Sequence, residues 1–211
     1  MLVMKVLLIN GSPNEKGCTF TALNEFAETL NHEGIESEIF WLGKKAVQGC
    51  ISCFKCIELG RCVFDSDGVN KIASRLDEFD GFIFGSPVYY AGPAGSICAF
   101  LDRLFFSCDK TKLFNKPGAC IVSCRRGGAS ASFDRLNKYF TITNMPIVSS
   151  HYWNQVHGNT PEEVRQDIEG LQTVRNLARN MAWLLKSIEA GKKAGIKTPE
   201  LEQVQFTNFI R

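Results

Sequence analysis

Four cysteines lie close together in the sequence, with the spacing of ligands for a metal ion or an iron–sulfur cluster. They are Cys50, Cys53, Cys56 and Cys62, which fall within thirteen residues. Thiolates two residues apart on a looping backbone can converge on one cubic cluster, and Gly60 allows a turn before the last ligand. The bacterial ferredoxin pattern has three residues before its fourth cysteine and then a proline. This chain departs from it, with five residues and then Val63.

The spacing alone leaves three interpretations of these cysteines open. The thiols hold a 4Fe-4S cluster, or they hold zinc, which usually takes cysteine pairs set further apart. In the third interpretation they bind no metal, and either pair when oxidised or lie inert at an interface. Residue types indicate which metals suit a site but not whether the site is filled.

A second candidate site is a turn of short polar side chains at residues 11–19. Backbone N–H groups at the start of a helix attract anions. The turn is not a P-loop, because five residues instead of four separate Gly11 from Gly17, and Cys18 stands where a lysine is needed. It also lacks the glycine pattern of a dinucleotide fingerprint, and the next strand ends in the apolar run 40–42 instead of an acidic residue. The turn therefore predicts a terminal monophosphate, bound by Ser12, Pro13, Asn14, Gly17, Cys18 and Thr19.

The alternative for this turn is an ordinary helix cap without a ligand. For Cys18 we expect a backbone N–H donor role, and a thiol pKa lowered by the start of the helix.

Two further loops have the residue types that suit a flat ring. The first is rigid and aromatic, and its candidate residues are Pro87, Val88, Tyr89 and Tyr90. A tyrosine there can stack on a ring or flank it, or else simply cover the core. The second loop has glycines that let the backbone approach a ring edge, and its candidates are Ser123, Arg125, Gly127 and Gly128. The arginines alternatively form a solvated basic pair.

Apolar runs that alternate with helical periodicity predict the elements that position these residues. Strands are expected at residues 3–9, 35–42, 81–85, 119–123 and 146–149. Helices are expected at residues 19–32, 69–77, 95–106, 132–140 and 161–188. The alternation predicts an α/β fold with a doubly wound, five-stranded parallel sheet and helices on both faces.

In such a sheet, with strand order 2-1-3-4-5, the first and third strands are neighbours at the switch point, so the phosphate turn and the aromatic loop face one another. We expect one domain at residues 1–190 with a cysteine-rich insertion at 49–67, and a C-terminal tail at 191–211.

Composition excludes several classes of protein. The chain has 211 residues and a formal net charge of +2, which gives no electrostatic footprint for nucleic acid or an anionic membrane. The first strand runs straight into a turn, and no basic leader or cleavage site is apparent. Nine cysteines, an odd number, fit a reducing compartment. We therefore expect a cytoplasmic protein.

Three motifs together resemble a known family. They are Gly-Ser-Pro-x-x-x-Gly-x-Thr from Gly11, Gly-Ser-Pro-Val-Tyr-Tyr from Gly85, and Phe-Leu-Asp-Arg-Leu at residues 100–104. The sequence resembles the flavodoxin-like NADPH-dependent FMN reductases and, with the cysteine segment, their iron–sulfur flavoprotein-like branch. The resemblance implies FMN held by residues 12–19 at its phosphate and by residues 87–90 at its ring. It also implies a homodimer or homotetramer with active sites at subunit boundaries.

The resemblance implies an FMN-containing NAD(P)H-dependent oxidoreductase that passes hydride from nicotinamide to flavin N5 and on to a small-molecule acceptor. One alternative is an iron–sulfur flavoprotein that carries electrons from ferredoxin through a 4Fe-4S cluster. Another is a non-catalytic, redox-responsive protein whose cysteine segment senses oxidation. No side chain is predicted to be catalytic, because the cofactor carries the chemistry. Asp102 and Arg103 are expected to form surface or interhelix pairs, and residues 151–153 to lie over a neighbouring subunit's flavin or to form a lid.

Overall fold

Five parallel strands form the centre of the protein in the computed structural model, which describes residues 4–207. They are β1 (Lys5–Asn10), β2 (Glu36–Trp41), β3 (Gly81–Tyr89), β5 (Gly118–Cys124) and β6 (Gln155–His157), in the order β2-β1-β3-β5-β6. Counted along the chain, this is the predicted order 2-1-3-4-5. The short β4 (Gly92–Pro93) pairs antiparallel with the end of β3. The first residue of the predicted strand 3–9 lies outside the described residues.

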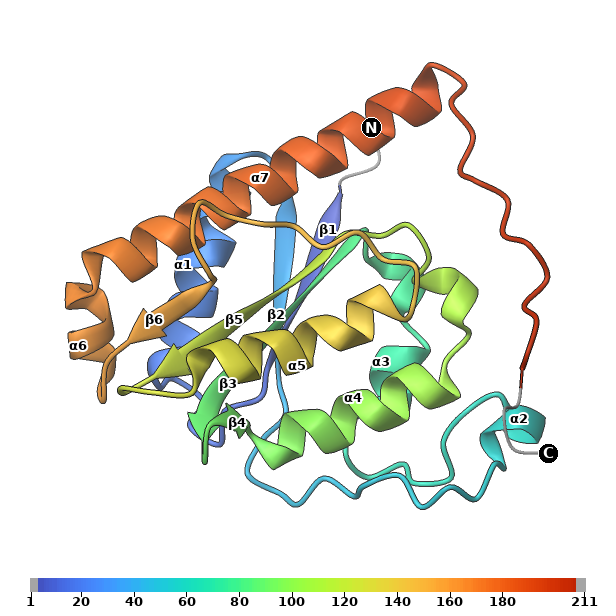
Figure 1. Cartoon of the computed structure of the whole chain (residues 1–211), viewed down its shortest axis with the longest axis horizontal. Helices are drawn as coiled ribbons and strands as arrows, with labels where there is room; N and C mark the ends of the chain where they lie inside the picture. The colour runs from blue at the N-terminus through green and yellow to red at the C-terminus, as the bar shows by residue number, and fades with distance from the viewer. Residues whose placement is uncertain (1–3, 208–211) are drawn as a thin grey trace.

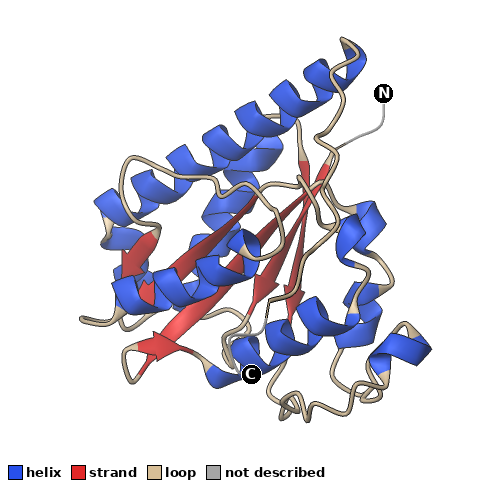
Figure 2. Cartoon of the chain, turned by 45° about the vertical axis from the view of Figure 1, so that its right-hand side comes forward, coloured by secondary structure: helices blue, strands red, loops and turns tan. Residues whose placement is uncertain are grey.

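Helices cover both faces of the sheet, as predicted (Figure 1). One face carries α1 (Cys18–His32), α6 (Pro161–Gln166) and α7 (Ile168–Lys193), and the other carries α3 (Val69–Ala73), α4 (Gly95–Ser107) and α5 (Ala129–Thr141). Two 3₁₀ turns lie at Leu76–Glu78 and Lys110–Lys112. The single-turn α2 (Cys56–Leu59) projects from the body (Figure 2). Among residues 4–207, no helix is long and apolar enough to cross a membrane.

Glycines in the central strands let the helices pack closely on the sheet. A Cβ added at Gly85 would lie 2.6 Å from Leu23 of α1, and one added at Gly118 would lie 2.3 Å from the ring of Phe140 of α5. That ring stacks on Phe84 with centroids 4.5 Å apart. Each face of the sheet thereby has one continuous buried core.

The fifth strand is not where the sequence predicts it. Residues 146–149 make only a bridge between Ile147 and Gly118 at the start of β5. The chain then leaves the sheet and returns as β6, which pairs with Val122 to Cys124 at the other end of β5. The free edge of β5 has backbone hydrogen-bonding groups along its whole length, so two short segments can pair with it. The apolar pattern of the sequence predicts only the first of these segments, residues 146–149.

The long predicted helix 161–188 is two helices. α6 ends before Asp167, whose ψ of 77° is not helical. The Asp167 carboxylate caps α7 by accepting from the backbone N–H of Gly170 at 2.9 Å, and it accepts from the N–H of His157 at 2.6 Å. The break therefore ties the start of α7 to β6.

Other element boundaries also shift from the predicted ones. β3 extends past residue 85 to Tyr89, α5 begins at Ala129, the predicted helix 69–77 is α3 followed by a 3₁₀ turn, and α7 continues to Lys193. Residues 194–207 contain no helix or strand.

Candidate functional site

The loops after β1, β3 and β5 meet at the carboxyl edge of the sheet. Gly11 joins the first loop to β3, because its N–H donates to the carbonyl oxygen of Gly85 at 2.9 Å. The loop also packs tightly on α4, since a Cβ at Gly11 would lie 2.6 Å from that of Ile97. The loop after β1 and the end of β3 are therefore neighbours, as the predicted strand order requires.

Hydrogen bonds within the turn after β1 and from β2 fix its backbone. The Ser12 hydroxyl accepts from the N–H of Asn14 at 3.1 Å, and the Ser12 carbonyl accepts from the indole N–H of Trp41 at 2.8 Å. The Asn10 side chain accepts from the N–H of Ser12. These bonds fix the backbone of the turn before any ligand is present.

Thr19 has a buried hydroxyl that makes no hydrogen bond within the described residues. The residue is 1% exposed and lies in the first turn of α1. A buried polar atom without a partner is costly in a native protein and calls for an explanation. The first turn of α1 contains no acidic side chain, so the positive end of the helix is not neutralised by this part of the chain. Both features suit an anionic ligand.

Cys18 differs from its prediction. Burial raises the pKa of its thiol, an effect that outweighs the lowering by its backbone and by Ser123. The helix start does not activate this cysteine, because its half-buried side chain packs against the core beside Ser123 of β5. The prediction of a lowered thiol pKa is therefore wrong, while the backbone N–H role stays a prediction.

The aromatic loop is a tight hairpin between β3 and β4. Pro87, Val88 and Tyr89 belong to β3, and the two residues that connect it to β4, Tyr90 and Ala91, have φ angles of 50° and 58°. Such left-handed residues match a type I′ turn, which usually takes asparagine or glycine. The buried Ser86 stabilises the hairpin base by donating to the Pro87 carbonyl at 2.8 Å and accepting from the Ala94 N–H at 2.9 Å. Tyr90 is fully exposed at the tip.

Gly128 brings the third loop against this hairpin. Its φ is 97°, and a Cβ there would lie 2.5 Å from the Cα of Ala91 and 2.9 Å from Val88. Ser123 lies opposite Pro87 in the strand register. Arg125 is exposed. The predicted residues of all three loops thus lie at one edge of the sheet, and which of them touch a ligand stays a prediction.

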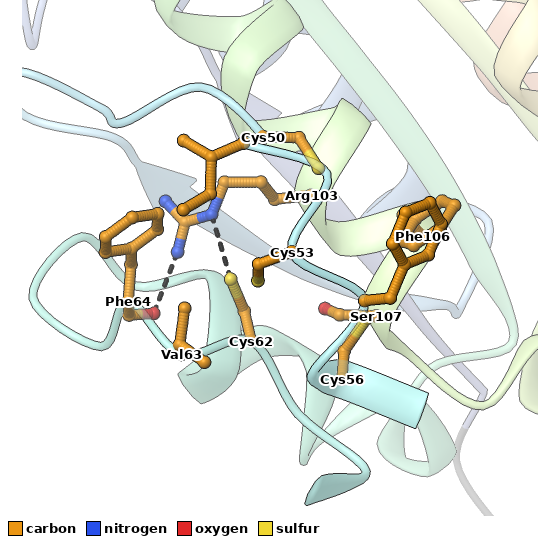
Figure 3. A pocket seen from close by; sticks show the side chains of 11 residues that line it. Cys50, Cys53, Cys56, Cys62, Val63, Phe64, Arg103, Phe106 and Ser107 are labelled. Carbon is orange, nitrogen blue, oxygen red and sulfur yellow. Dashed lines mark hydrogen bonds between the residues drawn. The ribbon is translucent and has the colours of Figure 1, made fainter. Parts of the chain in front are cut away.

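The four clustered cysteines line one cavity (Figure 3). Ser52 and Phe54 flank Cys53 with left-handed φ angles of 54° and 57°, so the backbone turns sharply on either side of it. The Phe54 ring packs edge-on against Phe106 of α4, with centroids 6.0 Å apart. All nine cysteines are free thiols. Within residues 4–207, no three His, Cys, Asp or Glu side chains are arranged to bind a metal ion. The segment therefore brings together four thiols, which are the ligands that an iron–sulfur cluster takes. The thiols are not yet arranged with the geometry of a metal site.

Arg103 does not form the surface or interhelix pair that the sequence predicted, and its contact with the cysteine segment was not predicted. It is 1% exposed instead of lying at the surface, and it forms a buried ion pair with Asp67. Its guanidinium donates to the Cys62 sulfur, as Figure 3 shows, at 3.2 Å. Removing one partner of such a buried pair typically destabilises a protein by roughly 3–5 kcal/mol. By contrast, Asp102 pairs with Arg135 across α4 and α5, as predicted.

A doubly wound parallel sheet with this strand order and helices on both faces defines a flavodoxin-like fold. A family model described as NADPH-dependent FMN reductase matches residues 4–160. The chain belongs to this family of flavin-dependent oxidoreductases.

Curated relatives agree with this assignment. An iron-sulfur flavoprotein of Methanocaldococcus jannaschii is 33% identical over 193 residues, covering 88% of this chain and 100% of the relative. An iron-sulfur flavoprotein of Archaeoglobus fulgidus is 25% identical, covering 86% of this chain and 97% of the relative. In fold, the chain is similar to RosB with a bound 8-demethyl-8-formylriboflavin-5'-phosphate intermediate (TM-score 0.70, 13% identity, covering 99% of this chain and 94% of RosB).

Proposed function

We propose that this protein binds FMN non-covalently and oxidises NAD(P)H, passing the electrons on to a small-molecule acceptor. The observation that carries the proposal is the buried, unpartnered hydroxyl of Thr19 at the start of α1. A phosphate oxygen would give this hydroxyl an acceptor, and the charge would suit the helix end. When bound, FMN supplies the hydride chemistry, so no side chain is assigned as catalytic.

The phosphate end would lie in the turn after β1. The Thr19 and Ser12 hydroxyls would donate to phosphate oxygens, joined by the Asn14 side chain and the backbone N–H groups of Gly17 and Cys18. Ser12 can do so while holding the turn, since its oxygen accepts from the Asn14 N–H and its own proton is still available. Pro13 fixes the local backbone conformation.

The ring end would lie between the hairpin and the third loop. Pro87, Val88 and Tyr89 would border the flat ring, and the Gly127–Gly128 backbone would approach its edge. Arg125 would stabilise negative charge on the reduced ring. Tyr90, fully exposed at the hairpin tip, would be free to contact a nicotinamide or the second subunit of a homodimer or homotetramer.

A second candidate function is electron transfer through a 4Fe-4S cluster, with a ferredoxin as the other partner. The observation in its favour is the set of four thiols at one cavity, one of them bonded to a buried arginine. Cys50, Cys53, Cys56 and Cys62 would be the ligands. Exposed free thiols such as those of Cys50 and Cys53 suit a reducing compartment, so we propose the cytoplasm as its location.

Anaerobic purification followed by two measurements tests both candidates. NADH and NADPH are each added while the visible absorbance of the flavin is followed, with dithionite as the reference reductant. Loss of flavin absorbance on addition of NADH or NADPH supports the reductase. If dithionite bleaches the flavin and neither nicotinamide does, the reductase is rejected. Iron and sulfide are assayed on the same sample. About four of each per chain support the cluster, and their absence after anaerobic reconstitution rejects it.

A further inference from the structure

Arg103 links α4 to the whole cysteine segment. It is the largest fully buried side chain among the described residues. Besides the Cys62 sulfur, its guanidinium donates to the carbonyl oxygen of Gln48 at 3.1 Å and to that of Phe64 at 2.8 Å. It therefore contacts the chain before, at and after the four cysteines. An arginine can do this because its planar fork carries five donors in fixed directions.

Cys62 is held from two directions. Its backbone N–H donates to the Asn70 side chain at 2.9 Å, and its carbonyl accepts from the same side chain at 2.9 Å. Asn70 belongs to α3, so that helix fixes the backbone of Cys62 while α4 fixes its sulfur. In residues 4–207, the sulfurs of Cys50, Cys53 and Cys56 make no such bond.

The charges around Cys62 are fixed as well. The guanidinium places a positive charge against the sulfur, and the buried carboxylate of Asp67 places a negative charge on the far side of the guanidinium. The reduction potential of an iron–sulfur cluster depends on hydrogen bonds to its sulfurs and on nearby charge. One-electron reduction adds a negative charge, which an N–H donor and a positive charge stabilise.

We propose that Arg103 is a positioning residue that fixes Cys62 as the anchored ligand of a cluster and raises the cluster's reduction potential. Asp67 opposes this effect by partly neutralising the guanidinium. The inference rests on the second candidate function above, in which the four thiols hold a 4Fe-4S cluster. The redox step is the gain of one electron from an external reductant, with no covalent bond formed or broken.

Potentiometric titration with dithionite and mediators, followed by electron paramagnetic resonance on the FMN- and cluster-loaded protein, tests the proposal. Arg103→Met removes the donor and the positive charge, so the midpoint potential of the cluster should fall. Asp67→Asn keeps Arg103 and removes the negative charge, so the potential should rise. Arg135→Met on α5 is the control for loss of an arginine, because Arg135 pairs with Asp102 and does not line the cavity of the four clustered cysteines; the cluster potential of this variant should equal that of the wild type.

A purely structural role of Arg103 would not shift the midpoint potential in opposite directions in Arg103→Met and Asp67→Asn. The double variant Arg103→Met/Asp67→Asn leaves no unpaired buried charge, and its potential should lie below that of Asp67→Asn. The proposal is overturned if Arg103→Met keeps its iron with an unchanged potential, or if Asp67→Asn fails to raise the potential. If the Arg103→Met protein loses its iron, the cluster potentials of Asp67→Asn and of the double variant test the proposal instead. A wild-type protein that takes up no iron and sulfide rejects the cluster itself, and this result is distinct from a loaded cluster whose potential ignores Arg103.

Discussion

Replacing Thr19 with valine should change the stability of the FMN-free protein and its affinity for FMN in opposite directions. Valine has nearly the shape of threonine but lacks the hydroxyl that is buried without a partner. Leaving a buried polar group unsatisfied costs about 1–3 kcal/mol. The FMN-free Thr19→Val protein should therefore be more stable than wild type by up to about that amount.

FMN binding should weaken in the same variant. A hydrogen bond to a charged group contributes about 1.5–3 kcal/mol, which corresponds to a roughly 10- to 150-fold rise in Kd. Urea denaturation of the FMN-free protein measures the first effect, and quenching of FMN fluorescence on titration measures the second.

Thr29→Val is the matched control for this substitution. Thr29 lies in the same helix and is also buried, but its hydroxyl donates to the Glu25 carbonyl at 2.8 Å. That variant should lose a satisfied hydrogen bond, gain no stability and leave Kd unchanged. If Thr19→Val destabilises the FMN-free protein and leaves Kd unchanged, the phosphate does not bind at this turn.

Three further predictions concern other parts of the structure. Gly128→Ala should weaken FMN binding, because the new Cβ would meet the Cα of Ala91 at 2.5 Å at a left-handed φ; an unchanged Kd would show that the third loop does not border the ligand. The Arg75 guanidinium lowers the pKa of Glu38 to about 2. A carboxylate whose pKa is lower in the folded state stabilises the fold at pH values above its unfolded pKa, and this contribution is lost as the pH falls toward the folded pKa. The stability advantage of wild type over Glu38→Gln should therefore shrink from about pH 5 to pH 2. An advantage that does not depend on pH would refute this. Burial raises the pKa of Cys108 to about 11, so mass spectrometry should find this thiol unmodified after brief iodoacetamide treatment of the native protein, and modified after unfolding.

Local patterns in the sequence were enough to predict most of the fold and the three loops. The buried strands and amphipathic helices follow from hydrophobic periodicity. The turn at residues 11–19 follows from the end of the first strand, whereas most of the segment 85–90 continues β3 to Tyr89. Parallel strands with right-handed crossovers then leave few possible orders, so the meeting of these two loops could be predicted as well.

Tertiary structure decided what depends on competition between distant groups. Residues 146–149 and β6 both pair with the edge of β5, the first at its start and the second at its end. Which segment pairs at which position depends on the hydrogen bonds that each can form there. Asp167 divides a periodic helix because two N–H groups, one of them on β6, need its carboxylate. Arg103 lies 41 positions from Cys62, and in sequence it is one charged residue on a helix. Its role exists only because the fold buries it where the cysteine segment supplies acceptors and Asp67 supplies the opposite charge.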